Sequence, residues 1–228
     1  MSHPEDNEAL ARRLERDPDY RVLRRVQARE VFAAPVRETK LGVLLDTETT
    51  GLDPRKDKVI ELAMIAFGFD ERGRVCRVRE RFQAFNDPGR PIPAEVVELT
   101  GITDEMVRGR SIDPDAVARV VGPAVVVIAH NAAFDRPFVE ALHPVFATKA
   151  WACSLSEIPW SEAGIGSAKL DYLAMRYGLF HDGHRGLADC EVLLAILAGA
   201  LPGSNHPTLK RLLEMAREPT WRGGALKN

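Results

Sequence analysis

The sequence predicts an α/β domain built on a mixed sheet. Three strand-like runs come first along the chain, and strand and helix patterns alternate after residue 90. Consecutive strands followed by alternating strands and helices are typical of a sheet with both antiparallel and parallel pairs. The chain has 228 residues, of which 45% are hydrophobic and 28% charged. This balance is that of an ordinary globular protein and excludes collagen-like and intrinsically disordered classes.

The length allows one ample domain with extensions at its ends. We expect an N-terminal helical extension over residues 1–40, a main domain over 41–200, and a C-terminal helix and tail over 201–228. Seven arginines lie between Arg12 and Arg29 among recurring leucines and valines, which predicts one or two short amphipathic helices. The favoured interpretation is a helix packed on the domain with a solvated basic face. The alternative is an arm that binds nucleic acid or a protein partner.

The three early strands are predicted from apolar runs separated by turn residues. The run 41–46 ends in an acid and is followed by a turn with Gly51, Asp53 and Pro54. The runs 59–69 and 74–85 flank a short polar turn, so we expect them to form a β-hairpin.

The later elements follow from helix signals and one strongly apolar strand. Helix starts are expected at Ala94, at Thr103 and at Asp113-Pro114, where an N-cap residue precedes proline. The run 124–129 is almost entirely apolar, which predicts a buried strand. Helices are expected after it over residues 132–142, 169–177 and 187–197.

Charge and cysteine content constrain partners and compartment. The 31 basic and 33 acidic residues give a net charge of −2, so nucleic-acid binding would have to rest on local patches. Cys76, Cys153 and Cys190 lack the spacing of a zinc site, and their number suits a reducing compartment. The start of the chain has no apolar leader, and the longest apolar stretch, 192–201, is about half of the ~20 residues that cross a bilayer. We therefore expect a cytoplasmic protein without membrane contact.

The first candidate site residues are Asp46 and Glu48. Successive side chains of a strand alternate, so these two carboxylates lie on the same side and Thr47 on the other. Acids after a strand are also common as solvated or turn-capping groups.

The second candidate lies in His130-Asn131-Ala-Ala-Phe134-Asp135, directly after the most apolar strand. Asp135 is expected in the first turns of a helix at the carboxyl edge of the sheet, where open α/β sheets place their sites. The alternative is an ordinary helix start, with Asn131 as cap and Asp135 stabilised by the helix dipole.

The third candidate is the pair His184 and Asp189. Five residues turn a helix by about 140°, so the two side chains converge only if His184 lies in a loop before a helix that carries Asp189. Gly183 and Gly186 favour such a loop, although a histidine in a glycine-rich loop is often merely exposed.

Together these segments supply four carboxylates and one imidazole. Like charges within ~4–6 Å raise one another's pKa, so a cluster of this kind requires cations, and oxygen ligands favour Mg²⁺ or Mn²⁺. Two such ions ~3.5–4 Å apart support in-line attack on a phosphodiester. A histidine with an ordinary pKa of about 6.5 can accept a proton from the attacking water.

The three segments resemble a known family. Asp46-Thr-Glu48-Thr-Thr-Gly-Leu52, Asn131-Ala-Ala-Phe134-Asp135 and His184 with Asp189 resemble the motifs of DEDD-family 3′→5′ exonucleases, histidine subtype, a group that includes the proofreading epsilon subunit of DNA polymerase III. The resemblance covers roughly residues 41–200. It implies a ribonuclease H-like fold with a mixed five-stranded sheet and helices on both faces. It also implies two Mg²⁺ or Mn²⁺ ions on Asp46, Glu48, Asp135 and Asp189, with His184 as general base.

The same resemblance implies substrate-binding residues. Thr49, Thr50, Gly51 and Leu52 would contact the 3′-terminal nucleotide, with Leu52 as a wedge beside the last base, and Asn131 would order its loop. Two departures stand out. Gly186 replaces the usual alanine, and Cys153-Ser154 stands where an Asp-Thr pair is usual. Neither removes a ligand, but a glycine here is expected to loosen the His184 loop and slow the reaction.

The function expected from all of this is metal-dependent 3′→5′ exonuclease activity on single-stranded ends, with DNA favoured over RNA. One alternative is an exoribonuclease that trims RNA 3′ ends. Another is a catalytically silent module that binds nucleic acid or a polymerase. The chain has no polymerase-length segment, so proofreading would require a DNA polymerase partner in trans. The oligomeric state stays open.

Overall fold

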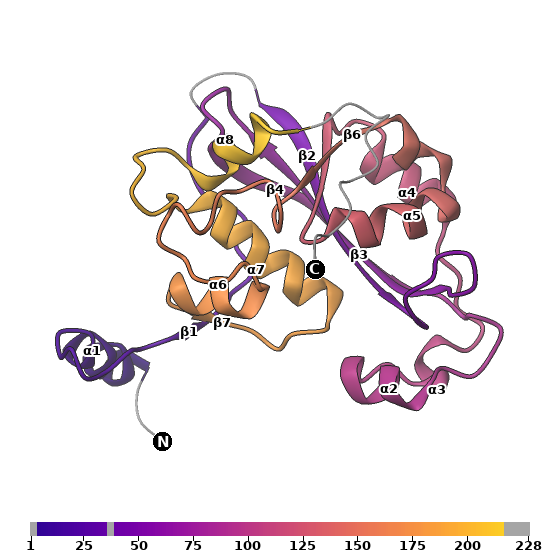
Figure 1. Cartoon of the computed structure of the whole chain (residues 1–228), viewed down its shortest axis with the longest axis horizontal. Coiled ribbons are helices and arrows are strands. Elements are labelled where there is room, and N and C mark those ends of the chain that lie inside the picture. The colour runs from indigo at the N-terminus through magenta and orange to yellow at the C-terminus, as the bar shows by residue number, and fades with distance from the viewer. Residues whose placement is uncertain (1–3, 36–38, 217–228) are drawn as a thin grey trace.

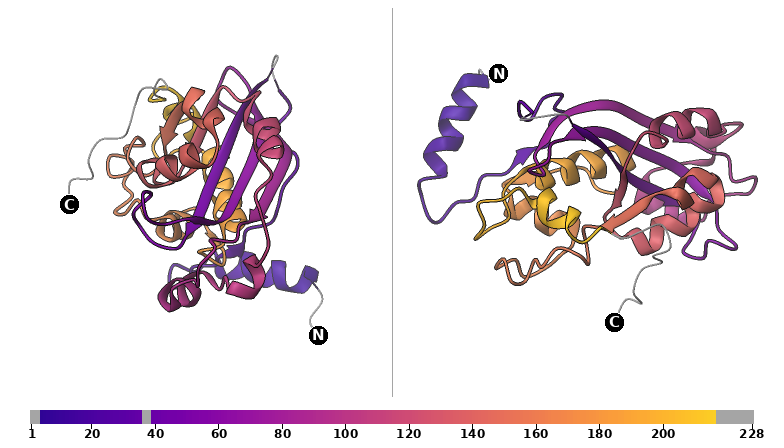
Figure 2. Two further views of the ribbon diagram at one scale, coloured as in Figure 1. Left: turned by 90° about the vertical axis from the view of Figure 1, so that its right-hand side faces the viewer. Right: turned by 90° about the horizontal axis from the view of Figure 1, so that it is seen from above.

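The computed structural model describes residues 4–35 and 39–216. Its centre is a mixed five-stranded sheet in the order β4-β3-β2-β5-β6, with helices on both faces (Figure 1, Figure 2). The predicted fold class is therefore confirmed. Within the described ranges, no helix is long and apolar enough to cross a membrane.

The four strands predicted from the residues form the sheet together with a fifth strand that was not predicted from them. β2 (Lys40–Thr49) pairs antiparallel with β3 (Val59–Phe69), which pairs antiparallel with β4 (Val75–Phe85), as the hairpin prediction required. β5 (Val126–Ala129) runs parallel to β2, and β6 (Ala150–Cys153) runs parallel to β5. β2 extends beyond the predicted end, so Asp46 and Glu48 belong to the strand itself. The parallel pairing brings the carboxyl ends of β2 and β5 to the same edge.

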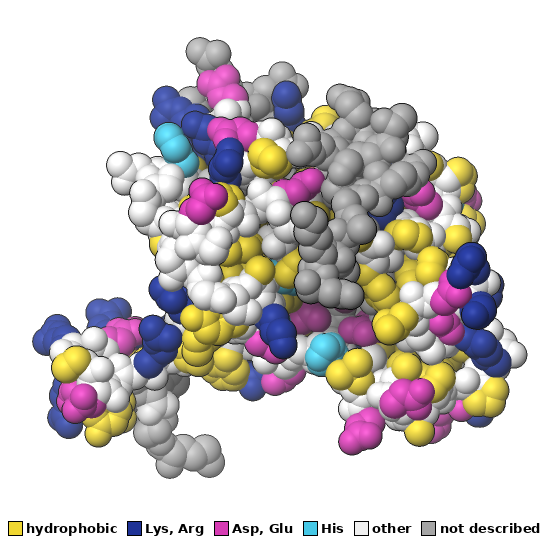
Figure 3. All heavy atoms as spheres, in the orientation of Figure 1, with side chains coloured by type: hydrophobic (Ala, Val, Ile, Leu, Met, Phe, Trp, Pro, Cys, Tyr) yellow, Lys and Arg dark blue, Asp and Glu magenta, His cyan; other side chains and the backbone are white. Residues whose placement is uncertain are grey.

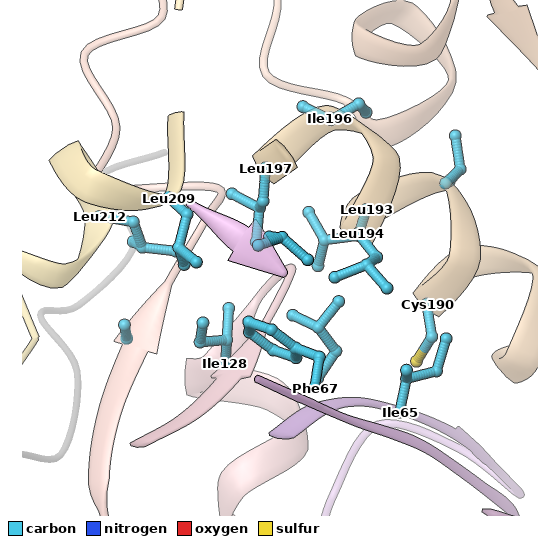
Figure 4. Close-up of a cluster of buried hydrophobic side chains, with 14 of the residues drawn as sticks. Ile65, Phe67, Ile128, Cys190, Leu193, Leu194, Ile196, Leu197, Leu209 and Leu212 are labelled. Carbon is cyan, nitrogen blue, oxygen red and sulfur yellow. The ribbon is translucent and has the colours of Figure 1, made fainter. Parts of the chain in front are cut away.

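One face of the sheet is covered by α6 (Leu170–Arg176), α7 (Gly186–Ala198) and α8 (Thr208–Leu213). Phe67 and Ile128 of the sheet pack against Leu193, Leu194 and Leu197 of α7 (Figure 4). Because α7 lies between the sheet and the other two helices, it is apolar on nearly all sides. This packing fixes the position of the α7 N-terminus relative to β2.

The other face is covered by α4 (Pro114–Val121), α5 (Ala132–Leu142) and the 3-10 helix η1 (Pro144–Thr148). Two short helices, α2 (Ala94–Thr100) and α3 (Asp104–Val107), follow the hairpin. The predicted helix starts are confirmed, since Thr103 accepts a hydrogen bond from the Met106 N–H and Asp113 accepts one from the Asp115 N–H. Such caps satisfy amide groups that the first turn of a helix leaves free.

The N-terminal segment differs from its prediction. α1 (Pro4–Leu14) stands away from the domain in Figure 1 and in the right-hand view of Figure 2, and none of its described residues joins a hydrophobic core cluster. The expectation of a helix packed on the domain is therefore wrong. The segment that packs is 24–33, and it contains no helix. Within it β1 (Arg24–Arg25) pairs in parallel with β7 (Leu179–Phe180), and the Phe32 N–H donates to the Cys76 carbonyl of β4. The backbone groups of this segment form hydrogen bonds with β7 and β4, and the second predicted helix does not form. The division of the chain at residues 40 and 200 stays a prediction.

Candidate active site

Three of the four predicted carboxylates meet at one point. Asp46 and Glu48 lie near the end of β2, and Asp189 lies in the first turn of α7. One oxygen from each lies within 4.8 Å of the others. They line a cavity of about 370 Å³ at the edge where β2 and β5 end. In the space-filling view, acidic side chains gather beside a histidine in a hollow below the centre of the molecule (Figure 3).

The fourth carboxylate, Asp135, lines the same cavity but stands outside this group of three. It is buried in α5, and its Oδ1 accepts hydrogen bonds from the N–H (3.1 Å) and the hydroxyl (2.9 Å) of Thr47. The alternation that turns Asp46 and Glu48 to one side of β2 turns Thr47 to the other side, where α5 packs. Thr47 thereby joins the first and second motifs.

Burial, and for Asp46 and Glu48 also the neighbouring negative charges, disfavour the ionised form of these carboxylates. Burial raises the pKa of Asp46 well above its usual value, and the charges of Asp135 and Asp189 raise it further. Burial, followed by the charges of Asp189 and Glu61, raises the pKa of Glu48 to about 8. Burial raises the pKa of Asp135 to about 7, against the opposing effect of its bonds from Thr47. Without cations, part of this cluster therefore holds protons at neutral pH.

The donor set fits hard divalent cations. Carboxylate oxygens are the ligands of Mg²⁺ and Mn²⁺, whereas zinc sites usually include nitrogen or sulfur. Asp46, Glu48 and Asp189 offer such oxygens at one point, with Asp135 close by in the same cavity. Bound cations would offset the burial and the repulsion that otherwise favour protonated carboxylates in this cluster.

A fifth carboxylate, Glu61, was missed by the sequence analysis. It lies opposite Glu48 in the β2–β3 pair and is fully buried. It accepts hydrogen bonds from the Gly186 N–H, at 3.3 Å, and from the side-chain amide of Gln83. The signal was present in the sequence, because Glu61 is the single acid in the otherwise apolar run 59–69. Glu61 joins β3 to the start of α7.

The third motif has the predicted division between loop and helix. His184 is exposed in a loop and lines the cavity, and its N–H donates to Asp189 Oδ2 at 3.2 Å. Its φ of 59° is left-handed, a conformation that non-glycine residues seldom adopt and that is often found at functional sites.

Gly186, in contrast, is the first residue of α7 and not part of a loose loop. A Cβ atom added there would lie 2.9 Å from Ala63 Cβ and 3.4 Å from Asp46 Oδ2. The glycine therefore permits a close approach of α7 to β3 at the acidic cluster. This replaces the expectation that it loosens the His184 loop.

Four of the five predicted substrate-binding residues line the cavity, namely Thr49, Gly51, Leu52 and Asn131. Leu52 is 82% exposed at its mouth. The fifth, Thr50, lies outside the cavity lining, and its hydroxyl interacts with Asp57, Lys58 and Arg90. Thr50 thus holds the turn that presents Leu52.

The segment before α5 contributes two further groups. Asn131 occupies the N-cap position with φ 156° but its side chain makes no capping bond, so the interpretation of a simple cap is wrong. His130 pairs through Nδ1 with Ser154 Oγ at 2.9 Å, and its buried Nε2 has no hydrogen-bond partner within the described part of the chain. Burial lowers the pKa of His130 to about 4, so it is neutral at physiological pH. The sequence pattern predicts no role for it.

The comparison with protein families gives one match over most of the domain. The family model RNase_T, described as Exonuclease, matches residues 43–197. The DNA polymerase III subunit epsilon of Treponema pallidum is 30% identical over 210 residues, which cover 81% of this chain and 91% of that protein. The PolC-type DNA polymerase III of Listeria innocua is 38% identical over 104 residues, 44% of this chain but only 7% of the polymerase.

Solved structures share the fold at low sequence identity. Exonuclease X in complex with 5′ overhanging duplex DNA has a TM-score of 0.53 at 21% identity and covers 74% of this chain and 99% of its own. The zinc-bound form of Escherichia coli ExoI with ssDNA has a TM-score of 0.59 at 20% identity, covering 78% of this chain and 43% of its own. These likenesses support the ribonuclease H-like architecture.

Proposed function

Because this chain belongs to the exonuclease family whose model matches residues 43–197, we propose that it hydrolyses phosphodiester bonds at the 3′ end of single-stranded nucleic acid, with DNA favoured over RNA. The products are nucleoside 5′-monophosphates. DNA is favoured because the Treponema pallidum protein, which is matched over 91% of its own length, is a subunit of a DNA polymerase. We propose that the protein acts in the cytoplasm.

The observation that carries the proposal is the convergence of Asp46, Glu48 and Asp189 within 4.8 Å. Several partly buried carboxylates with raised pKa values, side by side, can all be ionised only when cations are bound among them. We propose that these three acids, with Asp135, hold two Mg²⁺ or Mn²⁺ ions. Such ions, when bound, stabilise the charge on the attacking and leaving oxygens of a phosphodiester.

His184 is the proposed general base. It is exposed beside the acids, so its ring can reach a water molecule that solvent supplies to the cavity. As that water attacks phosphorus, the imidazole accepts its proton and the bond to the 3′ oxygen of the preceding nucleotide breaks. The left-handed backbone at His184 fixes the side on which the ring enters the cavity.

The terminal nucleotide is proposed to lie between two exposed apolar side chains. Leu52 is 82% exposed and Leu99 is 56% exposed, and both line the cavity. Exposed leucines that share one cavity offer an apolar surface to a base, while the backbone of Thr49 and Gly51 can bind its sugar. The side chain of Asn131, which lines the cavity, can pair with polar atoms of the strand.

A DNA polymerase is the proposed protein partner. The ground for this is the 30% identity to a polymerase III epsilon subunit and the match to part of PolC-type polymerases. The two alternatives, an exoribonuclease and a silent binding module, keep the same fold and differ in the reaction.

The test uses 5′-labelled single-stranded DNA and RNA of one sequence, with Mg²⁺, Mn²⁺ or EDTA. The proposal expects a ladder that shortens from the 3′ end, faster on DNA, in either metal and not in EDTA. Faster shortening of RNA would favour the exoribonuclease. Binding of either strand without cleavage would favour the silent module.

A further inference from the structure

We propose that His181 is a positioning residue that fixes the carboxylate of Asp189 for cation binding. This inference rests on the proposed function, since it assumes that Asp189 is one of the cation ligands. It concerns a histidine that the sequence motifs leave without a role, three residues before the proposed base.

The contact between His181 and Asp189 is short, and the His181 side chain is buried. The side chain of His181 is only 4% exposed, and its Nε2 lies 2.7 Å from Asp189 Oδ1. The other oxygen of the same carboxylate accepts the His184 N–H at 3.2 Å. Both oxygens of Asp189 are therefore held by the 181–184 loop, and the carboxylate has little freedom to rotate.

The direction of the hydrogen bond follows from its partners. An ionised carboxylate only accepts, so the bond to Asp189 requires a hydrogen on His181 Nε2. A second carboxylate oxygen, Asp171 Oδ1, lies 3.7 Å from the same nitrogen. A lone pair on Nε2 would face two negative charges, and an N–H group faces them favourably. His181 thus acts as a donor.

The backbone around His181 is anchored by the N-terminal segment. His181 follows β7, and β7 pairs with β1 through Arg24 with Leu179 and Arg25 with Phe180. The Arg25 guanidinium lies 4.8 Å above the Phe180 ring and contacts Asp182 at 2.7 Å. These contacts hold the residues on both sides of His181, so the imidazole is presented to Asp189 from a fixed position.

His181 is poorly placed to act as the base itself. Its side chain is almost fully buried, whereas the ring of a general base must reach the attacking water. The exposed His184 lines the cavity and meets that requirement. The two histidines therefore have different roles. His184 accepts the proton of the attacking water, and His181 orients the cation ligand Asp189. Donors that orient ligand groups commonly contribute about 10- to 100-fold to metal affinity or activity.

The test is direct titration of metal-stripped full-length protein with Mn²⁺ by calorimetry, without nucleic acid. His181→Leu keeps most of the volume and removes the donor, and His181→Gln returns an N–H at similar reach. We expect His181→Leu to weaken Mn²⁺ affinity about 10- to 100-fold and His181→Gln to restore most of it. The control Asp171→Asn alters the exposed second carboxylate and is expected to bind Mn²⁺ like the parent.

The outcomes separate the inference from the proposed function. Unchanged Mn²⁺ affinity in folded His181→Leu protein would overturn the inference alone. If His181→Leu does not fold, His181→Asn against His181→Gln decides, because the shorter amide falls short of Asp189. Equal affinity in these two variants would also overturn the inference. If the Asp46→Asn variant binds Mn²⁺ with the same affinity as the parent, the proposed function is overturned, and the inference with it.

Discussion

Thr47 donates both its backbone N–H and its hydroxyl to one oxygen of Asp135, at 3.1 and 2.9 Å. The two residues lie 88 positions apart in the chain. Their contact places a residue of α5 against β2, beside the proposed ligands Asp46 and Glu48. The position of Asp135 in the site therefore depends on a side chain that itself points away from the acidic cluster.

Thr47→Val tests this contact, because it removes the hydroxyl donor and keeps the shape. We expect a free energy of unfolding lower by about 1.5 to 3 kcal/mol, as for loss of a buried hydrogen bond to a charged group. We also expect a higher Mg²⁺ concentration for half-maximal activity. Thermal unfolding and a Mg²⁺ titration of the cleavage rate measure the two effects. Thr47→Ser keeps the donor, so it should lose much less stability and need less additional Mg²⁺. Equal losses in the two variants would show that the hydroxyl bond to Asp135 is not the cause.

His184→Ala tests the proposed base. The cleavage rate should fall by about 10²- to 10⁴-fold, the usual contribution of a positioned base. Mn²⁺ affinity should stay near that of the parent, because the imidazole is not a proposed ligand and the His184 N–H that holds Asp189 belongs to the backbone. Single-turnover cleavage and calorimetry give the two numbers. A rate within about threefold of the parent would exclude His184 as the base.

Gly186→Ala tests the close approach of α7 to β3. The added Cβ would lie 2.9 Å from Ala63 Cβ, so the start of the helix would have to move. Overpacking of this kind costs about 1 to 3 kcal/mol, and displacement of Asp189 should lower activity. Adding Ala63→Gly relieves the contact and should recover part of both losses. No recovery in the double variant would show that the contact is not the cause.

The acidic cluster predicts a pH dependence of stability in metal-free protein. The pKa of Glu48 is raised from 4.5 to about 8 and that of Asp135 to about 7. The native state therefore binds more protons than the unfolded chain, and stability falls as pH rises through these values. His130, with its pKa lowered to about 4, has the opposite effect below its unfolded value of about 6.5. The opposing effect of His130 is absent above about pH 6.5, so stability should fall between about pH 6.5 and 8. The pKa of His181, raised by its hydrogen bond to Asp189, acts in the same direction there.

Thermal unfolding in EDTA across that window should show a falling Tm. Mg²⁺ should raise Tm more at pH 8 than at pH 6.5, because the cations take the place of protons. Glu48→Gln should flatten the slope in EDTA. A Tm that rises with pH in EDTA would contradict the electrostatic account of the site.

The sequence allowed most of the sheet, and the common side of Asp46 and Glu48, to be predicted for local reasons. The roles of the site residues came from the family resemblance and stay a prediction. Alternation along a strand is enough to place Asp46 and Glu48 on one side of β2. Apolar periodicity was enough to bound α5 at residues 132–142. These features depend on neighbours in the chain, so a single sequence contains them.

The remaining features depend on contacts between distant segments. Glu61 faces Glu48 only because of the register of the β2–β3 pair. Residues 24–25 form a strand because β7 offers them a partner, although their local pattern favoured a helix. The sequence pattern favours a loop at Gly186, and only the distance to Ala63 shows that the glycine permits α7 to approach β3 closely. Periodicity cannot report such tertiary contacts.

The central claim is that Asp46, Glu48 and Asp189 hold the cations that make cleavage possible. The most direct measurement is the cleavage rate of labelled single-stranded DNA against Mg²⁺ concentration for the parent, for Asp46→Asn and for a control, Asp115→Asn, in the exposed first turn of α4. The account predicts saturable Mg²⁺-dependent shortening from the 3′ end for the parent and the control, and loss of cleavage in folded Asp46→Asn protein. Full cleavage by Asp46→Asn, or cleavage by the parent in EDTA, would contradict it.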